Sequence, residues 1–178
     1  MRHSKVSNWL VISHVYISDE DWFEDKEEES GMENMLEKYN IEQIRLLPMG
    51  QDENIGFSSE EEVRDFFDND LSENGIYYYG KRGLDIYNQD TLILFQYNGF
   101  IIGYGVLKTR NYEKGYYQFY PKSIHNIEKI SSVEFKAVNP DFKKFGQGMA
   151  SVCIEFLEPI SVLLKIKQAV FDERGNNF

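Results

Sequence analysis

The sequence predicts an α+β domain with a mixed β-sheet at its centre. Three features of the 178 residues support this prediction: a tight turn between two apolar runs at 91–107, helix-capping patterns at 59–62 and 131–134, and a hydrophobic content of 42%. Because this apolar content suffices for a sizeable core, we expect a single folded domain over residues 1–178.

The first expected elements lie in the first 75 residues, most of whose charged residues are acidic. Residues 9–13, Trp-Leu-Val-Ile-Ser, predict a strand because β-branched and aromatic residues are frequent there. Residues 19–37 are dense in acids and fit either an interrupted helix or a loop. Ser59 stands three residues before Glu62, and apolar residues follow at helical spacing. This combination predicts a helix over 59–71.

The clearest local signal is a β-hairpin in the middle of the chain. Residues 91–97 and 100–107 are apolar runs, and the Asn-Gly pair between them favours the positive φ angles of a tight turn. Gly103 and Gly105 share one face of the second strand, because side chains alternate along a strand. That face has room for another element, a bulge or a ligand, and we expect a hollow there beside aromatic rings.

The strands on either side of this hairpin are expected to be shorter. Residues 77–79 predict a short strand, and residues 108–114 a polar connection. Residues 116–120 predict a further strand, which ends at a proline. A second capping box, Ser131 with Glu134, then predicts a short helix over 131–138.

The last part of the chain leaves one alternative open. Apolar residues between 149 and 157 share one helical face, whereas residues 160–166 fit either a helix or a strand. Glycines that precede a helix N-terminus can expose amides to an anion, although glycines beside a helix also form plain turns. The candidates for such an anion site are Lys143, Gly146 and Gly148.

Charge and composition limit the partners. The net charge is −11, with 20 acidic and 6 basic residues in 1–75 against 10 acidic and 13 basic residues in 76–178. A polyanion would therefore approach the second half, while the acids serve solubility or meet a basic protein partner. One cysteine, no signal peptide and no long apolar run predict a cytoplasmic protein that does not interact with membranes.

Motifs for metal or covalent chemistry are missing from the sequence. The three histidines lack metal-ligand spacing, and no nucleophile elbow or phosphate loop occurs, so we expect no metal, no cofactor and no catalytic residue. Tyrosines of the second half alternate with basic residues, which suits either base stacking with phosphate contacts or simple packing on a sheet. These tyrosines are Tyr77, Tyr78, Tyr79, Tyr104, Tyr116, Tyr117 and Tyr120.

Several segments resemble PUA-like domains of the EVE and ASCH kind. The resemblance rests on Trp9-Leu-Val-Ile, on 88–103 with its Ile-Ile-Gly strand, and on 119–147. It implies a small, partly open β-barrel over 76–149 with flanking helices, an acidic, helix-containing elaboration at 14–75 and a C-terminal helical segment at 150–178.

This resemblance also implies a function without catalysis. Such domains bind RNA or modified DNA bases in an aromatic pocket. For this chain the expected stacking residues are Trp9, Tyr79, Tyr104 and Tyr117, and the residues expected to face phosphate are Lys81, Arg82 and Arg110.

A second resemblance gives an enzymatic alternative. Gly99 with residues 101–104 is similar to the central hairpin of GNAT acetyltransferases, and residues 138–148 are similar to their pyrophosphate loop. This resemblance implies transfer of an acetyl group from coenzyme A to an amine. A helix over 131–138 would contradict it, because that family has a strand there. A protein-interaction module that uses the acidic half is the third reading.

Overall fold

A computed structural model describes residues 38–50, 56–78, 90–111 and 114–175, all within one compact unit, 31–178. The strand expected at 9–13 and the acid-dense residues 19–37 lie outside the described residues.

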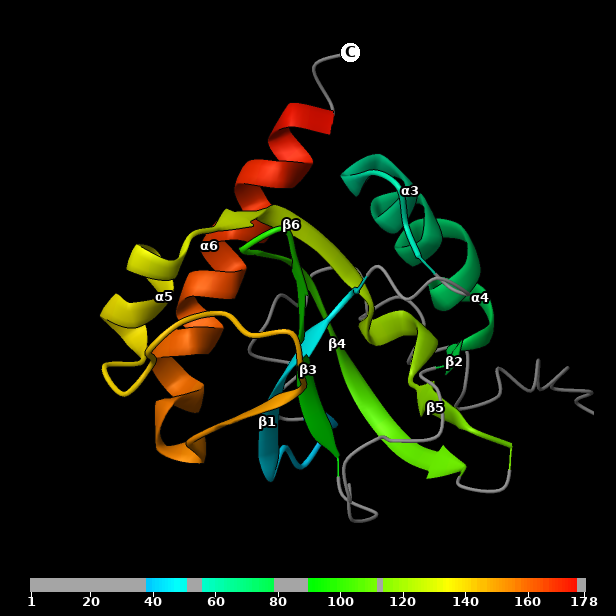
Figure 1. Ribbon diagram of the computed structural model, residues 1–178, viewed down its shortest axis with the longest axis horizontal. Coiled ribbons are helices and arrows are strands. Elements are labelled where there is room, and N and C mark those ends of the chain that lie inside the picture. Colours follow the sequence, from blue (N-terminus) through cyan, green and yellow to red (C-terminus); the bar gives the residue numbers. More distant parts are fainter. Residues whose placement is uncertain (1–37, 51–55, 79–89, 112–113, 176–178) are drawn as a thin grey trace, which may run out of the picture. The chain divides into compact units, whose positions relative to one another are not determined.

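Within the described residues, one mixed sheet of seven strands forms the centre of the fold (Figure 1). Its order is β2-β5-β4-β3-β1-β7, and β6 pairs with β4 beside this path. Strands β1 and β3 are parallel, whereas the other described pairs are antiparallel. The strands are β1 Gln43–Pro48, β2 Ile76–Tyr78, β3 Thr91–Tyr97, β4 Phe100–Asn111, β5 Tyr116–Phe119, β6 His125–Ile130 and β7 Ala150–Val152.

This sheet confirms the predicted fold class, a mixed and partly open sheet with flanking helices. Among the described strands, β2 and β7 lie at the two ends of the order, so the sheet does not close. Strand β1 belongs to the sheet although it lies within 14–75, the stretch expected as an elaboration. It pairs with β3 and β7.

The predicted hairpin is present. Asn98 and Gly99 have φ angles of 48° and 80°, as the tight turn requires. Strand β4 is longer than predicted and continues to Asn111, because residues 109–111 pair with β5. The expectation of a polar connection over 108–114 is therefore wrong for its first four residues.

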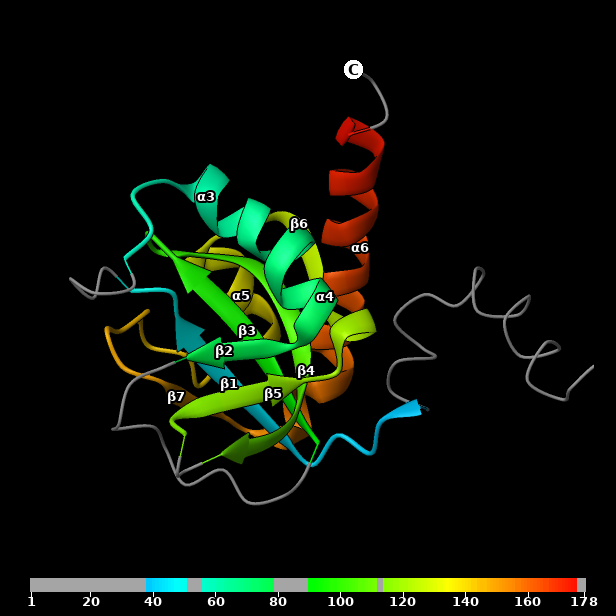
Figure 2. The ribbon, with the colours of Figure 1, turned by 90° about the vertical axis from the view of Figure 1, so that its right-hand side faces the viewer.

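Helices cover both faces of the sheet (Figure 2). On one face lie α3 Glu60–Asp65, a π-helical turn Phe66–Leu71 and α4 Ser72–Asn74. Their side chains form a core cluster with β3 and β5. On the other face lie α5 Ser132–Val138 and α6 Leu157–Gly175, which form a second core cluster with β3, β4 and β6.

Both predicted helix starts are confirmed by their caps. The Ser59 hydroxyl accepts a hydrogen bond from the Glu62 amide, and the Glu62 carboxylate accepts from the amide and hydroxyl of Ser58. At Ser131 the box is reciprocal, since the Glu134 carboxylate accepts from the Ser131 amide.

The helix expected over 149–157 is wrong. Residues 150–152 form β7, whose Val152 pairs with Ile44 of β1, and a 3₁₀ turn Ile154–Phe156 follows. Helix α6 then starts at Leu157 and includes 160–166, which settles the helix-or-strand alternative. Pro159 lies in its first turn, where a missing amide costs no hydrogen bond. None of the helices in the described segments has the length and hydropathy to span a membrane.

Candidate aromatic binding site

Strand pairing brings four of the predicted tyrosines together at one end of the sheet. In the register of β2, β5 and β4, Tyr77 lies opposite Tyr117, which lies opposite Arg110. The next row places Tyr78 opposite Tyr116, which lies opposite Asn111. Because residues directly opposite each other share a face, the two rows point to opposite faces of the sheet.

The two rows differ in exposure. In the first row, Tyr117 is 2% exposed, and the Arg110 guanidinium lies 5.5 Å from the centre of its ring. In the second row, Tyr78 is 56% exposed, and its ring meets that of Tyr116 edge to face at 5.8 Å. The second row therefore presents aromatic surface to solvent.

A cavity of about 310 Å³ lies beside β2. Its size falls in the range of about 300–1,000 Å³ that is typical of small-molecule sites. None of the side chains that line it carries a charge: the lining residues are Gly56, Phe57, Phe66, Ile76, Tyr77 and Tyr78. We call this cavity the aromatic pocket.

Two elements position the rings of the aromatic pocket. Phe66 begins the π-helical turn, and its ring centre lies 5.3 Å from that of Phe57 and 5.9 Å from that of Tyr77. The segment before α3 is held to the sheet by the Tyr97 hydroxyl of β3, which donates to the Phe57 carbonyl at 3.4 Å. The sequence interpretation missed Phe57 and Phe66, because Phe66 fitted a buried helix face and Phe57 belonged to no motif.

Tyr104, predicted to stack on a ligand, is a core residue instead. It is 1% exposed, its hydroxyl donates to the Gln168 side chain on α6, and Gln168 donates to Nδ1 of His125 at 3.2 Å. Burial raises the pKa of Tyr104, and the nearby carboxylate of Asp172 raises it further. Tyr104 and the buried Tyr117 therefore present no ring face to a ligand.

The hollow expected beside Gly103 and Gly105 is filled by the protein itself. A Cβ at Gly103 would lie 2.8 Å from the Phe67 ring, and one at Gly105 would lie 2.4 Å from Cδ1 of Ile124. Another element of the chain fills that face, and the strand register shifts between Ile101 and Gly103, so two of the three alternatives are present. The expectation of a ligand there is wrong.

The remaining predicted site residues fall into two groups. Trp9, Tyr79, Lys81 and Arg82 lie outside the described residues. The loop between α5 and β7 contains Lys143, Gly146 and Gly148. It leads into a strand, so no helix N-terminus exposes amides there. Together with helix α5 over 132–138, this arrangement contradicts the acetyltransferase alternative.

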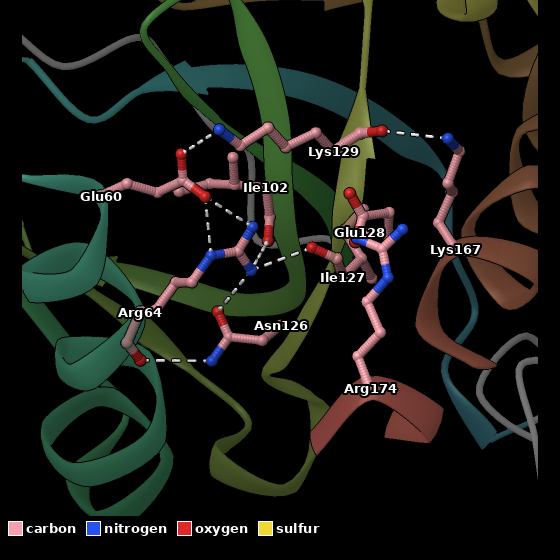
Figure 3. A network of polar contacts seen from close by, with 9 residues as sticks. All are labelled: Glu60, Arg64, Ile102, Asn126, Ile127, Glu128, Lys129, Lys167 and Arg174. Atoms are coloured by element: carbon pink, nitrogen blue, oxygen red, sulfur yellow. Dashed lines mark hydrogen bonds and ion pairs between the residues drawn. The ribbon is translucent and has the colours of Figure 1, made fainter. Parts of the chain in front are cut away.

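A second cavity, of about 340 Å³, lies between α3, β6 and the end of α6 (Figure 3). Its charged side chains pair with one another: Glu60 pairs with Arg64 and Lys129, and Glu128 pairs with Arg174. Burial alone would raise the pKa of Glu60, but hydrogen bonds from Lys129 and Arg64 outweigh it and lower that pKa. These mutual pairs leave little net charge for a ligand.

The surroundings of the aromatic pocket are electrostatically uneven. The helical segment 60–74, which contributes Phe66, exposes Glu61, Glu62, Asp65, Asp68, Asp70 and Glu73. By contrast, the β4–β5 hairpin end has Arg110 and the exposed Lys114. Among the described residues, no group of three His, Cys, Asp or Glu side chains is arranged to hold a metal ion.

The chain matches no protein-family model and no curated protein. Solved structures with a similar fold include the YTH domain of Zygosaccharomyces rouxii MRB1 in complex with N6-methyladenosine RNA. That domain is 13% identical, with a TM-score of 0.42, and the match covers 69% of this chain and 86% of the domain. The Pho92 YTH domain in complex with m6A is likewise 13% identical, covering 69% and 86%, with a TM-score of 0.41.

ASCH from Zymomonas mobilis is a further neighbour. It is 10% identical, the match covers 67% of this chain and 94% of that chain, and the TM-score is 0.42. The sequence resemblance names the same PUA-like kind of domain to which YTH and ASCH domains belong. With TM-scores below 0.5 and identities of 10% to 13%, these likenesses assign neither a family nor a ligand to this chain.

Proposed function

We propose that this chain is a non-catalytic binding module that holds a nucleobase, plain or modified, of a nucleic acid in the aromatic pocket. The observation that carries the proposal is the cavity of about 310 Å³ whose lining includes the four aromatic residues Phe57, Phe66, Tyr77 and Tyr78. Aromatic rings stack on the faces of bases and contribute roughly 1–3 kcal/mol per base.

The character of the lining favours a planar and uncharged ligand group. Its phenol and phenyl rings bury apolar surface, and the cavity has no charged side chain to neutralise an ion. Tyr78 lines the pocket and is 56% exposed, so the pocket has a solvent-facing edge where a base extruded from a strand can enter.

The charges beside the pocket favour one direction for the attached backbone. The acidic face of 60–74 repels phosphates, whereas Arg110 and Lys114 lie at the β4–β5 hairpin end. A single strand would therefore leave the pocket over β4 and β5 rather than over the helices. This arrangement suits short single-stranded segments better than a long duplex.

A titration series tests the proposal. The common nucleosides, N6-methyladenosine, 5-methylcytidine and short single-stranded RNA and DNA are titrated by nuclear magnetic resonance and calorimetry. Tyr78→Ala removes an exposed ring and should weaken binding by about 10-fold, in line with one lost stacking contact. Val162→Ala removes exposed apolar surface on α6 and should leave binding unchanged. The proposal is wrong if no member of the series binds, or if both variants bind like the wild type.

A further inference from the structure

A π-helical turn interrupts the helical segment beside the aromatic pocket. Residues Phe66–Leu71 form it, and the Ser72 amide donates to the carbonyl of Phe67, five residues earlier. Such turns are rare and often occur at functional sites. They need a local cause, such as a side chain that takes over a helix carbonyl.

A buried side chain on the neighbouring strand β6 contacts this helical segment. Asn126 is 5% exposed, and its Nδ2 donates to the Arg64 carbonyl at 3.2 Å and to the Asp68 carboxylate at 2.7 Å. Arg64 precedes the π-helical turn by two residues, and Asp68 lies within it. One buried amide thus binds two consecutive turns of the helical segment. Figure 3 shows its contact with the Arg64 carbonyl.

A glycine on β4 lets the π-helical turn approach the sheet closely. Asn126 lies opposite Gly103 of β4, and a Cβ at Gly103 would lie 2.8 Å from the Phe67 ring and 2.9 Å from the His125 carbonyl. The missing side chain lets the π-helical turn rest directly on the sheet within reach of the Asn126 amide.

We infer that Asn126 is a positioning residue for the aromatic pocket: its buried amide holds the π-helical turn and thereby directs Phe66 toward Phe57 and Tyr77. The expected effect of Asn126 on ligand binding rests on the proposed function. Its effect on the direction of the Phe66 ring does not depend on any ligand. Without the amide, the turn would revert toward regular α-helix. The parts of the helical segment before and after the turn would then rotate relative to each other about the helix axis. Phe66, which joins α3 to the turn, would lose its direction toward the pocket.

A matched pair of substitutions at the exposed Asp68 tests this role. Asp68→Ala and Asp68→Asn remove the same charge, but only Asn keeps an oxygen that can accept from Asn126. Asp68→Ala should weaken the binding of short oligoadenylate RNA by about 3- to 10-fold, the worth of one hydrogen bond, and Asp68→Asn should bind like the wild type. The ligand-free readout is the nuclear Overhauser contact between the rings of Phe66 and Tyr77.

Asn126→Leu removes both donors and should abolish that ring contact. Phe135→Leu, in the core cluster on the other face of the sheet, controls for general loss of stability. If Asn126→Leu fails to fold, the Asp68 pair decides alone, because Asp68 is exposed. A ring contact that persists in Asp68→Ala, and in any folded Asn126→Leu, overturns the inference. If the wild type binds no oligonucleotide, the proposed function fails, while the ring contact still decides the role of Asn126.

Discussion

Replacing Arg64 with methionine should destabilise the protein by much more than removal of an exposed charge does. The Arg64 guanidinium donates to the carbonyls of Ile127 at 2.9 Å and Ile102 at 3.3 Å, and both residues are fully buried. It also pairs with Glu60 and lies 4.8 Å from the centre of the Phe171 ring. Arg64 thus ties α3 to β4, β6 and α6 at once.

The magnitude follows from what the substitution leaves behind. Two buried carbonyls lose their charged donor, and an unsatisfied buried acceptor costs roughly 1–3 kcal/mol. Loss of the contact between cation and ring adds about 0.5–2 kcal/mol. The methionine side chain keeps the apolar packing of the arginine stem, and entering water can satisfy part of the exposed groups. We expect a net loss of about 3 kcal/mol in the free energy of unfolding.

Urea unfolding of wild type, Arg64→Met and Arg174→Met measures this loss, with the m-value as a check on two-state behaviour. Arg174 is largely exposed and makes an ion pair with Glu128, so its substitution should cost about 0.5 kcal/mol or less. The reasoning is refuted if the two variants lose similar stability, because burial of the carbonyls would then not matter.

Three further predictions concern the sheet, pH and charge. Gly103→Ala should cost about 1–3 kcal/mol by overpacking against Phe67, whereas Gly146→Ala, with its nearest neighbour 3.9 Å away, should be neutral in the same urea assay. Burial lowers the pKa of His125 in the folded state, although Asp172 opposes the shift. As pH falls below the unfolded value of about 6.5, the unfolded chain takes up the proton first. The free energy of unfolding should therefore fall between about pH 7 and 5.5, and His125→Gln should lose this slope. Arg110→Gln should reduce the salt dependence of oligonucleotide binding by about one unit of slope, while Lys144→Gln should not; equal slopes would place the phosphates elsewhere.

Local chemistry explains which elements the sequence predicts correctly. Asn98 and Gly99 favour the hairpin turn because both must have positive φ, and the serines before α3 and α5 cap their helices through atoms only three residues away. Strand β1 has no comparable signal, since its partners β3 and β7 lie far along the chain. The same long-range pairing overrides the helical pattern of 149–157, because Val152 pairs with Ile44.

The candidate site shows the same limit at the level of single side chains. The sequence correctly gathers tyrosines in β2, β4 and β5, but it cannot say which face of each strand the core takes. Tyr77 and Tyr78 are neighbours, yet one is buried and the other is mostly exposed. Tyr104 is buried because α6 supplies Gln168 as its partner, and this depends on a helix more than 50 residues away in the sequence.

The polar contacts on β6 and the aromatic pocket are coupled through one helical segment. Arg64 and Phe66 are two residues apart: the first is fixed to the carbonyls of β4 and β6, and the second forms a wall of the pocket. A helix is stiff over this distance, so a shift at Arg64 moves the Phe66 ring with it. Arg64→Met should therefore weaken ligand binding as well as stability, although Arg64 does not line the aromatic pocket. Arg174→Met breaks an ion pair of the same charged cavity without touching that segment, and it should leave binding unchanged.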